Sequence, residues 1–130
     1  MLEPTILKNL LSGGWETLPF SLFRDGISIS SILEGSPAIA VLRYEPGARV
    51  PLHEHVGAEM IFVLEGAQAD ENGTYGKGDI VINPAGSRHS VWSDDGCVVL
   101  LHWAEPVKFI EANTNGVWHK AHQTHWPGLV

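Results

Sequence analysis

The chain has 130 residues, of which 44% are hydrophobic and 18% charged, and its formal net charge is -7. This length predicts a single domain, and the hydrophobic fraction excludes a chain that is disordered throughout. The scattered basic residues exclude the basic patch of a nucleic-acid binder, and no apolar run is long enough to cross a membrane.

The chain begins with a segment, residues 1–14, that we expect to form an N-terminal arm. One short helical turn is predicted within residues 5–11, and Gly13-Gly14 ends it. No basic stretch followed by an apolar run opens the chain, so no secretory signal is predicted. The single cysteine, Cys97, excludes an internal disulfide, and we therefore expect a cytoplasmic location.

From residue 20 onward the chain consists of short apolar or alternating runs that end at Gly, Pro, Asn or Asp. These runs predict strands over residues 20–23, 27–33, 38–44, 59–64, 78–82, 89–92 and 98–103. Asn72-Gly73 and Asp95-Gly96 are typical of hairpin turns, because both pairs tolerate positive φ. Many short strands without room for crossover helices predict an all-β sandwich or barrel and exclude a parallel sheet.

Histidines near the middle of the chain have the spacing of metal ligands. His53 and His55 are two residues apart, so in a strand both point to the same face, about 6 to 7 Å apart along the chain. Glu59 opens the next predicted strand, and His89 follows the turn at residues 83–88. Three neutral imidazoles and one carboxylate suit Fe, Mn, Ni, Zn or Cu. Because a His-x-His pair alone also occurs on surface strands, the prediction rests on all four residues.

The same spacing resembles the two motifs of the cupin family. The matching residues are Gly47, His53, His55, Glu59 and Gly66 for the first motif, and Gly78, Pro84, Gly86 and His89 for the second. The departure is Ser93, where cupins usually place an Asn that shapes a turn. The resemblance implies a double-stranded β-helix, a single barrel over residues 15–112 with one divalent metal inside. Its ligands would be His53 and His55 from one strand, Glu59 from the next and His89 from the facing sheet.

A finer resemblance, over about residues 15–105, is to the ChrR-type cupins. It is carried by residues 42–48, 63–66, 70–78 and 83–89. In the anti-sigma factor that gives this group its name, the cupin follows a zinc-binding domain that holds the sigma factor. Only about 14 residues precede the resemblance here, and they contain neither His nor Cys, so we do not expect sigma-factor sequestration.

Two functions are compatible with a cupin metal site, and each involves a small-molecule ligand or substrate. One is a metal-dependent oxidoreductase, above all an iron-dependent dioxygenase. The other is a ChrR-like sensor module in which the metal has a structural role. A third hypothesis, a vestigial cupin, fits a complete ligand set least well.

Residues that could support chemistry beside the metal are Arg43, Tyr44, Gln68, Arg88 and Trp103. Alternation alone does not establish which of them point inward, so no catalytic residue is assigned and no organic cofactor is expected.

The last segment, residues 113–130, differs in composition and contains His119, His122 and His125. These histidines either form a second metal cluster or pack, and the lack of an acidic or cysteine partner favours packing on the barrel or on a second subunit. Cupins commonly pair their sheets, so we expect a homodimer. Cys97 heads an apolar run and is predicted to be a small buried hydrophobe.

Overall fold

The computed structural model describes residues 2–112 and 118–123, and it describes side chains up to residue 110. Two short 3₁₀ turns, η1 (Leu10–Ser12) and η2 (Gly14–Thr17), precede the strands. The strands are β1 (Ser21–Arg24), β2 (Ile27–Leu33), β3 (Ala38–Tyr44), β4 (Arg49–Glu54), β5 (Glu59–Asp70), β6 (Gly73–Gly76), β7 (Ile80–Asn83), β8 (Arg88–Trp92), β9 (Cys97–Trp103), β10 (Lys108–Ala112) and β11 (Trp118–Gln123). No helix in this part of the chain is long and apolar enough to cross a membrane.

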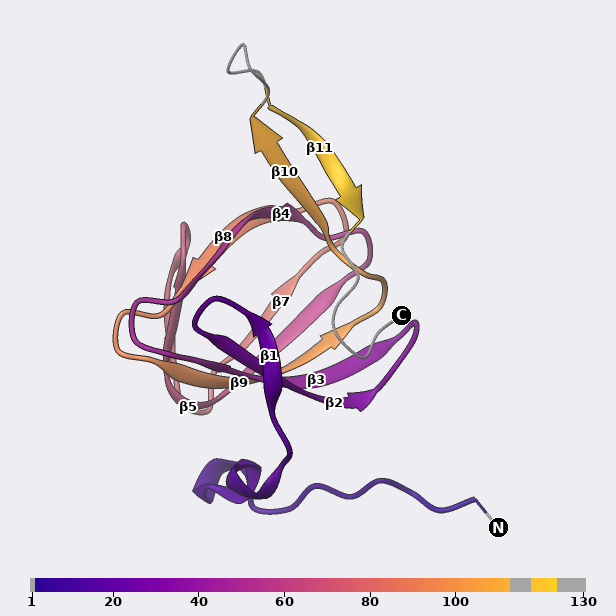
Figure 1. Ribbon diagram of the computed structural model, residues 1–130, viewed down its shortest axis with the longest axis vertical. Helices are drawn as coiled ribbons and strands as arrows, with labels where there is room; N and C mark the ends of the chain where they lie inside the picture. The colour runs from indigo at the N-terminus through magenta and orange to yellow at the C-terminus, as the bar shows by residue number, and fades with distance from the viewer. Residues whose placement is uncertain (1, 113–117, 124–130) are drawn as a thin grey trace.

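The strands pair antiparallel and curl into a barrel with two walls (Figure 1). The first wall has the order β1-β2-β3-β9-β5-β7, and the second has the order β6-β5-β8-β4-β10-β11. Strand β5 belongs to both walls and joins them. The all-β prediction is therefore confirmed.

A glycine lets β5 pass from one wall to the other. Residues 59–66 of β5 pair with β9, whereas residues 67–70 pair with β6. Gly66 has φ +69°, and a Cβ atom there would lie 2.2 Å from the carbonyl oxygen of Gly96. The sequence pattern ended this strand at Leu64, because a glycine inside a run of alternating residues usually marks its end.

The two predicted hairpin turns have different outcomes. Asn72-Gly73 does belong to a hairpin, because Asp70 pairs with Gly73 and the loop between β5 and β6 is Glu71 and Asn72. The hairpin predicted at Asp95-Gly96 is wrong. Strand β8 pairs with β4 and β5, whereas β9 pairs with β3 and β5, so this turn carries the chain from one wall to the other.

Strand β4 was not among the predicted runs, because Pro46, Gly47 and Pro51 give its region the composition of a loop. Its pairing with β8 is irregular between Val50 and His53, and Pro51 lies within that irregularity. Proline has no N–H to donate, so a bulge is a position where a strand tolerates it. This irregular strand carries the first histidine of the site.

Two groups of apolar side chains stabilise the barrel. The larger group fills the interior and contains Ile29, Leu42, Val50, Ile61, Val63, Val91, Val99, Leu101 and Trp103. The smaller group lies on the outer face of the first wall, where Val41, Leu64 and Val98 are buried. Side chains that precede β1, among them Leu10 and Trp15, pack against this outer group. The residues before β1 thus cover part of one face of the barrel.

Part of the last segment extends the second wall. Strand β11 pairs with β10, and the two strands project from the barrel (Figure 1). His119 and His122 lie on β11, while His125 falls outside the described residues. Packing of residues 113–130 on the barrel or on a second subunit stays a prediction.

Candidate metal site

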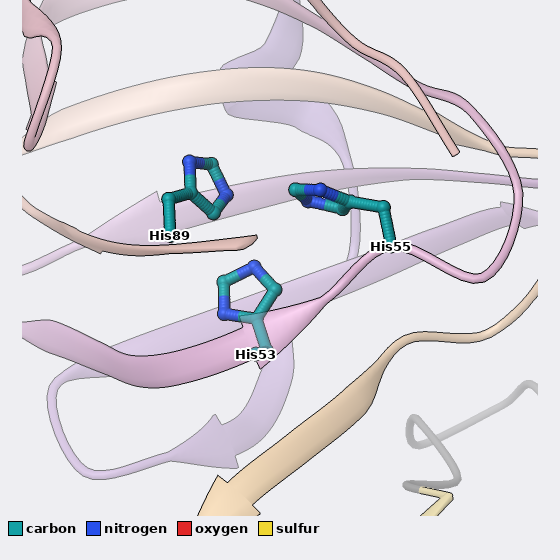
Figure 2. A group of neighbouring side chains, drawn as sticks. All are labelled: His53, His55 and His89. Carbon is teal, nitrogen blue, oxygen red and sulfur yellow. The ribbon is translucent and has the colours of Figure 1, made fainter. Parts of the chain in front are cut away.

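Three histidines meet inside the barrel (Figure 2). His53 on β4 is the direct pairing partner of His89 on β8, and His55 follows the end of β4. One ring nitrogen of each lies within 4.8 Å of those of the other two. All three residues are buried, with exposed fractions of 4%, 1% and 3% for His53, His55 and His89. This arrangement can hold a metal ion.

The two walls of the barrel contribute side chains to the site in a different way from the one predicted. His89 was expected from the wall facing His53, but β4 and β8 are neighbours in the same wall. The side chain from the other wall is that of Glu59, the first residue of β5, which pairs there with Trp103 of β9. The strand pairing explains the difference, because spacing along the chain does not reveal which strands become neighbours.

Hydrogen bonds donated by Nδ1 fix the tautomers of His53 and His89. Nδ1 of His53 lies 2.8 Å from the carbonyl oxygen of Pro51, and Nδ1 of His89 lies 3.0 Å from Oδ2 of Asp70. A carbonyl oxygen and an ionised carboxylate can only accept. Both Nδ1 atoms therefore donate, and in the neutral imidazole each Nε2 keeps its lone pair.

His55 reaches the same tautomer through a serine. Its Nδ1 lies 2.9 Å from Oγ of Ser87, and that hydroxyl already donates its proton to the carbonyl oxygen of Pro84 at 2.6 Å. The Ser87 oxygen must then accept from His55. All three imidazoles consequently present an Nε2 lone pair to the same space.

These Nε2 atoms have no donor to bind. Neither Nε2 of His55 nor Nε2 of His89 makes a hydrogen bond within the described residues, although both are buried. Nε2 of His55 lies 3.0 Å from Oε1 of Glu59, and Nε2 of His89 lies 3.9 Å from the same oxygen. Lone pairs that converge on a carboxylate repel one another unless a cation lies among them. The donor set therefore fits a metal ion.

The Glu59 carboxylate is held in place from the first wall. Its Oε2 accepts a hydrogen bond from Nε1 of Trp103 at 2.5 Å, and its Oε1 accepts one from Nδ2 of Asn83 at 3.1 Å. Burial alone would raise the pKa of Glu59, but its pKa is lowered overall, and the hydrogen bonds donated by Trp103 and Asn83 favour the ionised form. The carboxylate is therefore ionised and aimed at the imidazoles.

Burial also keeps His53 in the form that binds metals. It lowers the pKa of His53 to about 4, against the opposing effect of Glu59. The imidazole is neutral at physiological pH, and a neutral imidazole is the form that coordinates a metal.

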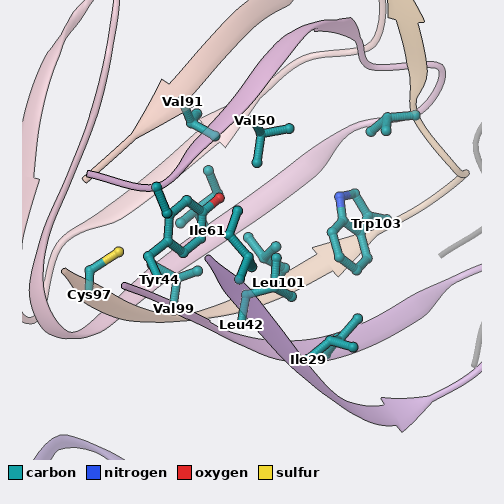
Figure 3. Packing of buried hydrophobic residues seen from close by; sticks show 14 of the residues in the cluster. Ile29, Leu42, Tyr44, Val50, Ile61, Val91, Cys97, Val99, Leu101 and Trp103 are labelled. Atoms are coloured by element: carbon teal, nitrogen blue, oxygen red, sulfur yellow. The ribbon is translucent and has the colours of Figure 1, made fainter. Parts of the chain in front are cut away.

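A small cavity adjoins the histidines, and the space in it that water can occupy is about 20 Å³. His53, Glu59 and His89 line it together with Tyr44, Gln68, Trp103 and apolar residues of both walls. Figure 3 shows Tyr44 and Trp103 among those apolar side chains.

Five residues were candidates for a role beside the metal. Of these, Tyr44, Gln68 and Trp103 line the cavity and therefore face inward. Arg43 and Arg88 do not: both are exposed, with Arg43 stacked on Phe20 and Arg88 paired with Glu54.

Three residues that position the histidines and Glu59 have no distinguishing pattern in the sequence: Asp70, Asn83 and Ser87. Asp70 was missed because β5 was not expected to continue so far. A bulge between Val63 and Glu65, followed by the bend at Gly66, changes which residues face inward. After the bend Gln68 and Asp70 face the interior, where Gln68 lines the cavity and Asp70 contacts His89, whereas Ile61 and Val63 face it before the bend. Simple alternation from Glu59 does not predict this change.

Cys97 is buried and belongs to the interior apolar group, as predicted for a small hydrophobe. Burial raises the pKa of its thiol to about 11, which a hydrogen bond with Ser93 offsets only in part.

Comparison with known proteins places the chain near one group. The family model described as "ChrR Cupin-like domain" matches residues 14–107. The anti-sigma-E factor ChrR of Cereibacter sphaeroides is 35% identical over 98 residues, which make up 73% of this chain and 44% of that protein. The chain thus spans less than half the length of this curated relative.

Solved structures agree with the fold. ChrR in complex with SigE from Rhodobacter sphaeroides has a TM-score of 0.63 and 27% identity, over 68% of this chain and 50% of that one. An acetylacetone dioxygenase from Acinetobacter johnsonii has a TM-score of 0.69 at 16% identity, over 92% and 85%. An RmlC-like cupin protein from Ralstonia eutropha has a TM-score of 0.70 at 14% identity, over 92% and 80%. The last two establish likeness of fold alone and confirm the double-stranded β-helix.

Proposed function

The chain belongs to the ChrR cupin-like family, and from this premise we propose that it binds one divalent transition metal and a small molecule beside it. The ligands would be His53, His55, Glu59 and His89. The observation that carries the proposal is the convergence of buried Nε2 lone pairs, without donors of their own, next to an ionised carboxylate. Zn, Fe, Mn and Ni all suit this donor set.

The cavity supports a small-molecule ligand of limited size and charge. The space in it that water can occupy is about 20 Å³, which is room for about one water-sized group beside the metal. None of the described residues that line it is Lys or Arg, so a phosphorylated ligand has no cationic side chain to bind. A ligand that places one small oxygen donor in this space fits best.

The roles of the protein side chains follow from their contacts. A bound metal would supply a Lewis acid for an oxygen donor of the ligand. Trp103 and Asn83 hold the Glu59 carboxylate, and apolar residues such as Leu42 and Val91 exclude water from the ligand. Tyr44 and Gln68, which are hydrogen-bonded to each other, offer the ligand a polar contact on the cavity wall.

Two finer functions follow from this proposal. A regulatory or sensory module is supported by the 35% identity with an anti-sigma factor. An iron-dependent dioxygenase is supported by the mainly apolar cavity beside the proposed ligand set. Elemental analysis of anaerobically purified protein separates them, because stoichiometric Fe favours oxygen chemistry and tightly held Zn favours the regulatory module. A homodimer and a cytoplasmic location stay predictions.

The test of the metal site is its loss on substitution. His53→Ala and His89→Ala should each remove stoichiometric metal while leaving a folded barrel, measured by elemental analysis and circular dichroism. His102→Ala is the matched control, because His102 also lies in a strand but is half-exposed and is not one of the clustered histidines. Metal content equal to wild type in either of the first two variants would contradict the proposal.

A further inference from the structure

One of the three imidazoles is held differently from the others. Nδ1 of His53 and of His55 donates to a neutral oxygen, whereas Nδ1 of His89 donates to the carboxylate of Asp70 at 3.0 Å. A carboxylate behind a metal-binding imidazole fixes its orientation and increases the basicity of the nitrogen that faces the metal. His89 should therefore be the strongest of the three imidazole donors.

Asp70 is itself held in place by its neighbours. It is the last residue of β5 and is only 5% exposed. Its Oδ1 accepts hydrogen bonds from the backbone N–H of Asn72 at 2.8 Å and from the hydroxyl of Tyr75 at 2.9 Å, which leaves Oδ2 for His89. Each carboxylate oxygen thus has a defined partner, and the β5–β6 turn determines where Oδ2 lies.

We propose that Asp70 is a positioning residue of the metal centre: it holds His89 in the tautomer and orientation that bind the metal, and Tyr75 holds Asp70. This inference rests on the proposed function, since it assumes that His89 is a metal ligand. It assigns to the β5–β6 turn a direct influence on metal affinity, although no residue of that turn reaches the metal site itself.

The same turn provides a matched control. Glu71, the neighbour of Asp70, accepts hydrogen bonds from the backbone N–H of Ser90 at 3.0 and 3.2 Å and from the Ser90 hydroxyl. It therefore contacts β8 one residue beyond His89, and its side-chain hydrogen bonds are exposed. A change at Glu71 would weaken the contact between the turn and β8 in general. It would not alter the hydrogen bond that positions His89.

The experiment compares Asp70→Asn, Tyr75→Phe and Glu71→Gln with wild type. Zn²⁺ affinity is measured by competition with a chelator, and the visible absorption of the Co²⁺-loaded protein reports the ligand field. Asp70→Asn should weaken Zn²⁺ binding by about 10- to 100-fold and shift the Co²⁺ bands. Tyr75→Phe should weaken it by about threefold, because one hydrogen bond to Asp70 is lost. Glu71→Gln should match wild type in both measurements.

The possible outcomes separate this inference from the proposed function. Wild-type protein that binds no Zn²⁺ overturns both. If the wild-type protein binds Zn²⁺ and Asp70→Asn shows the same affinity and the same Co²⁺ spectrum, only the inference is overturned. An equal loss of Zn²⁺ affinity in all three variants overturns it as well. If Asp70→Asn fails to fold, Tyr75→Phe is the deciding variant, because it keeps the Asp70 carboxylate. Wild-type Zn²⁺ affinity in Tyr75→Phe then overturns the proposal that Tyr75 on β6 holds Asp70 for metal binding.

Discussion

At the scale of single residues, the site is determined by the atoms behind the imidazoles as much as by the imidazoles themselves. Pro51 and Asp70 accept from two Nδ1 atoms, and Ser87 accepts from the third only because its own proton is given to Pro84. An Asn or a water in any of these places would leave the tautomer undetermined. The three acceptors together direct every Nε2 lone pair to the same side.

Cys97 provides a prediction with a defined pH dependence. Only the thiolate reacts with Ellman's reagent, and burial raises the pKa of this thiol to about 11. At pH 8 roughly one molecule in a thousand carries the thiolate, and the side chain is 4% exposed. We expect the native protein to react at least about 100-fold more slowly than the same protein in guanidinium chloride. Equal rates in the two solutions would contradict a buried structural thiol.

The residues of the proposed ligand set have a pattern in the sequence, but the residues that support them do not. His53, His55, Glu59 and His89 have a spacing that survives as a motif, since residues two apart share a face of a strand. Asp70 has no such spacing to His89. The two come together only because the end of β5 pairs with β8, and nothing local in the sequence specifies that pairing.

At the scale of elements, β5 determines the shape of the barrel. Its first part holds Glu59 in one wall, and its last part holds Asp70 in the other. A single bent strand therefore carries both carboxylates of the site, one facing the Nε2 atoms and one behind His89. Any change at the bend should alter the distance between these two carboxylates.

Gly66 is the test of this bend. Gly66→Ala should lower the free energy of unfolding by about 3 kcal/mol. The alanine backbone must keep a positive φ, and its methyl group overlaps the carbonyl oxygen of Gly96. Gly47→Ala is the control, since Gly47 has φ +83° with nothing within 4 Å of the added Cβ atom. It should cost about 1 kcal/mol, the conformational cost alone. Urea denaturation measures both, and equal losses would show that the bend tolerates a side chain.

Three of the segments that the predicted runs leave out share a physical cause, which does not apply to β10 and β11. The predicted strands are runs of alternating residues, whereas β4 contains Pro51, β6 begins at Gly73 and the end of β5 follows Gly66. Here proline lies at a bulge and glycine at a bend or beside a turn, so both belong to the sheet. The positions where the barrel bends are the ones that local sequence patterns interpret as loops.

At the scale of the whole molecule, the apolar interior and the histidines occupy neighbouring parts of one barrel. The interior group joins both walls through residues such as Leu42, Ile61 and Val91. On the outside, Trp15 and its neighbours cover the first wall. Neither group includes a residue of the proposed ligand set, so burial of apolar surface can hold the barrel together when the metal is absent.

Removal of the metal tests this separation of fold and site. Treatment with EDTA should lower the melting temperature by about 10 °C when free metal had been about 100-fold above its dissociation constant, because binding to the native state then contributes about 2.7 kcal/mol. The treated protein should keep its β-type circular dichroism at 25 °C and regain its melting temperature when metal is restored. His53→Ala should melt at the same temperature with and without EDTA. Unfolding at 25 °C on EDTA treatment would instead mean that the metal is required for the fold, and that outcome would favour the structural role over binding of a small molecule.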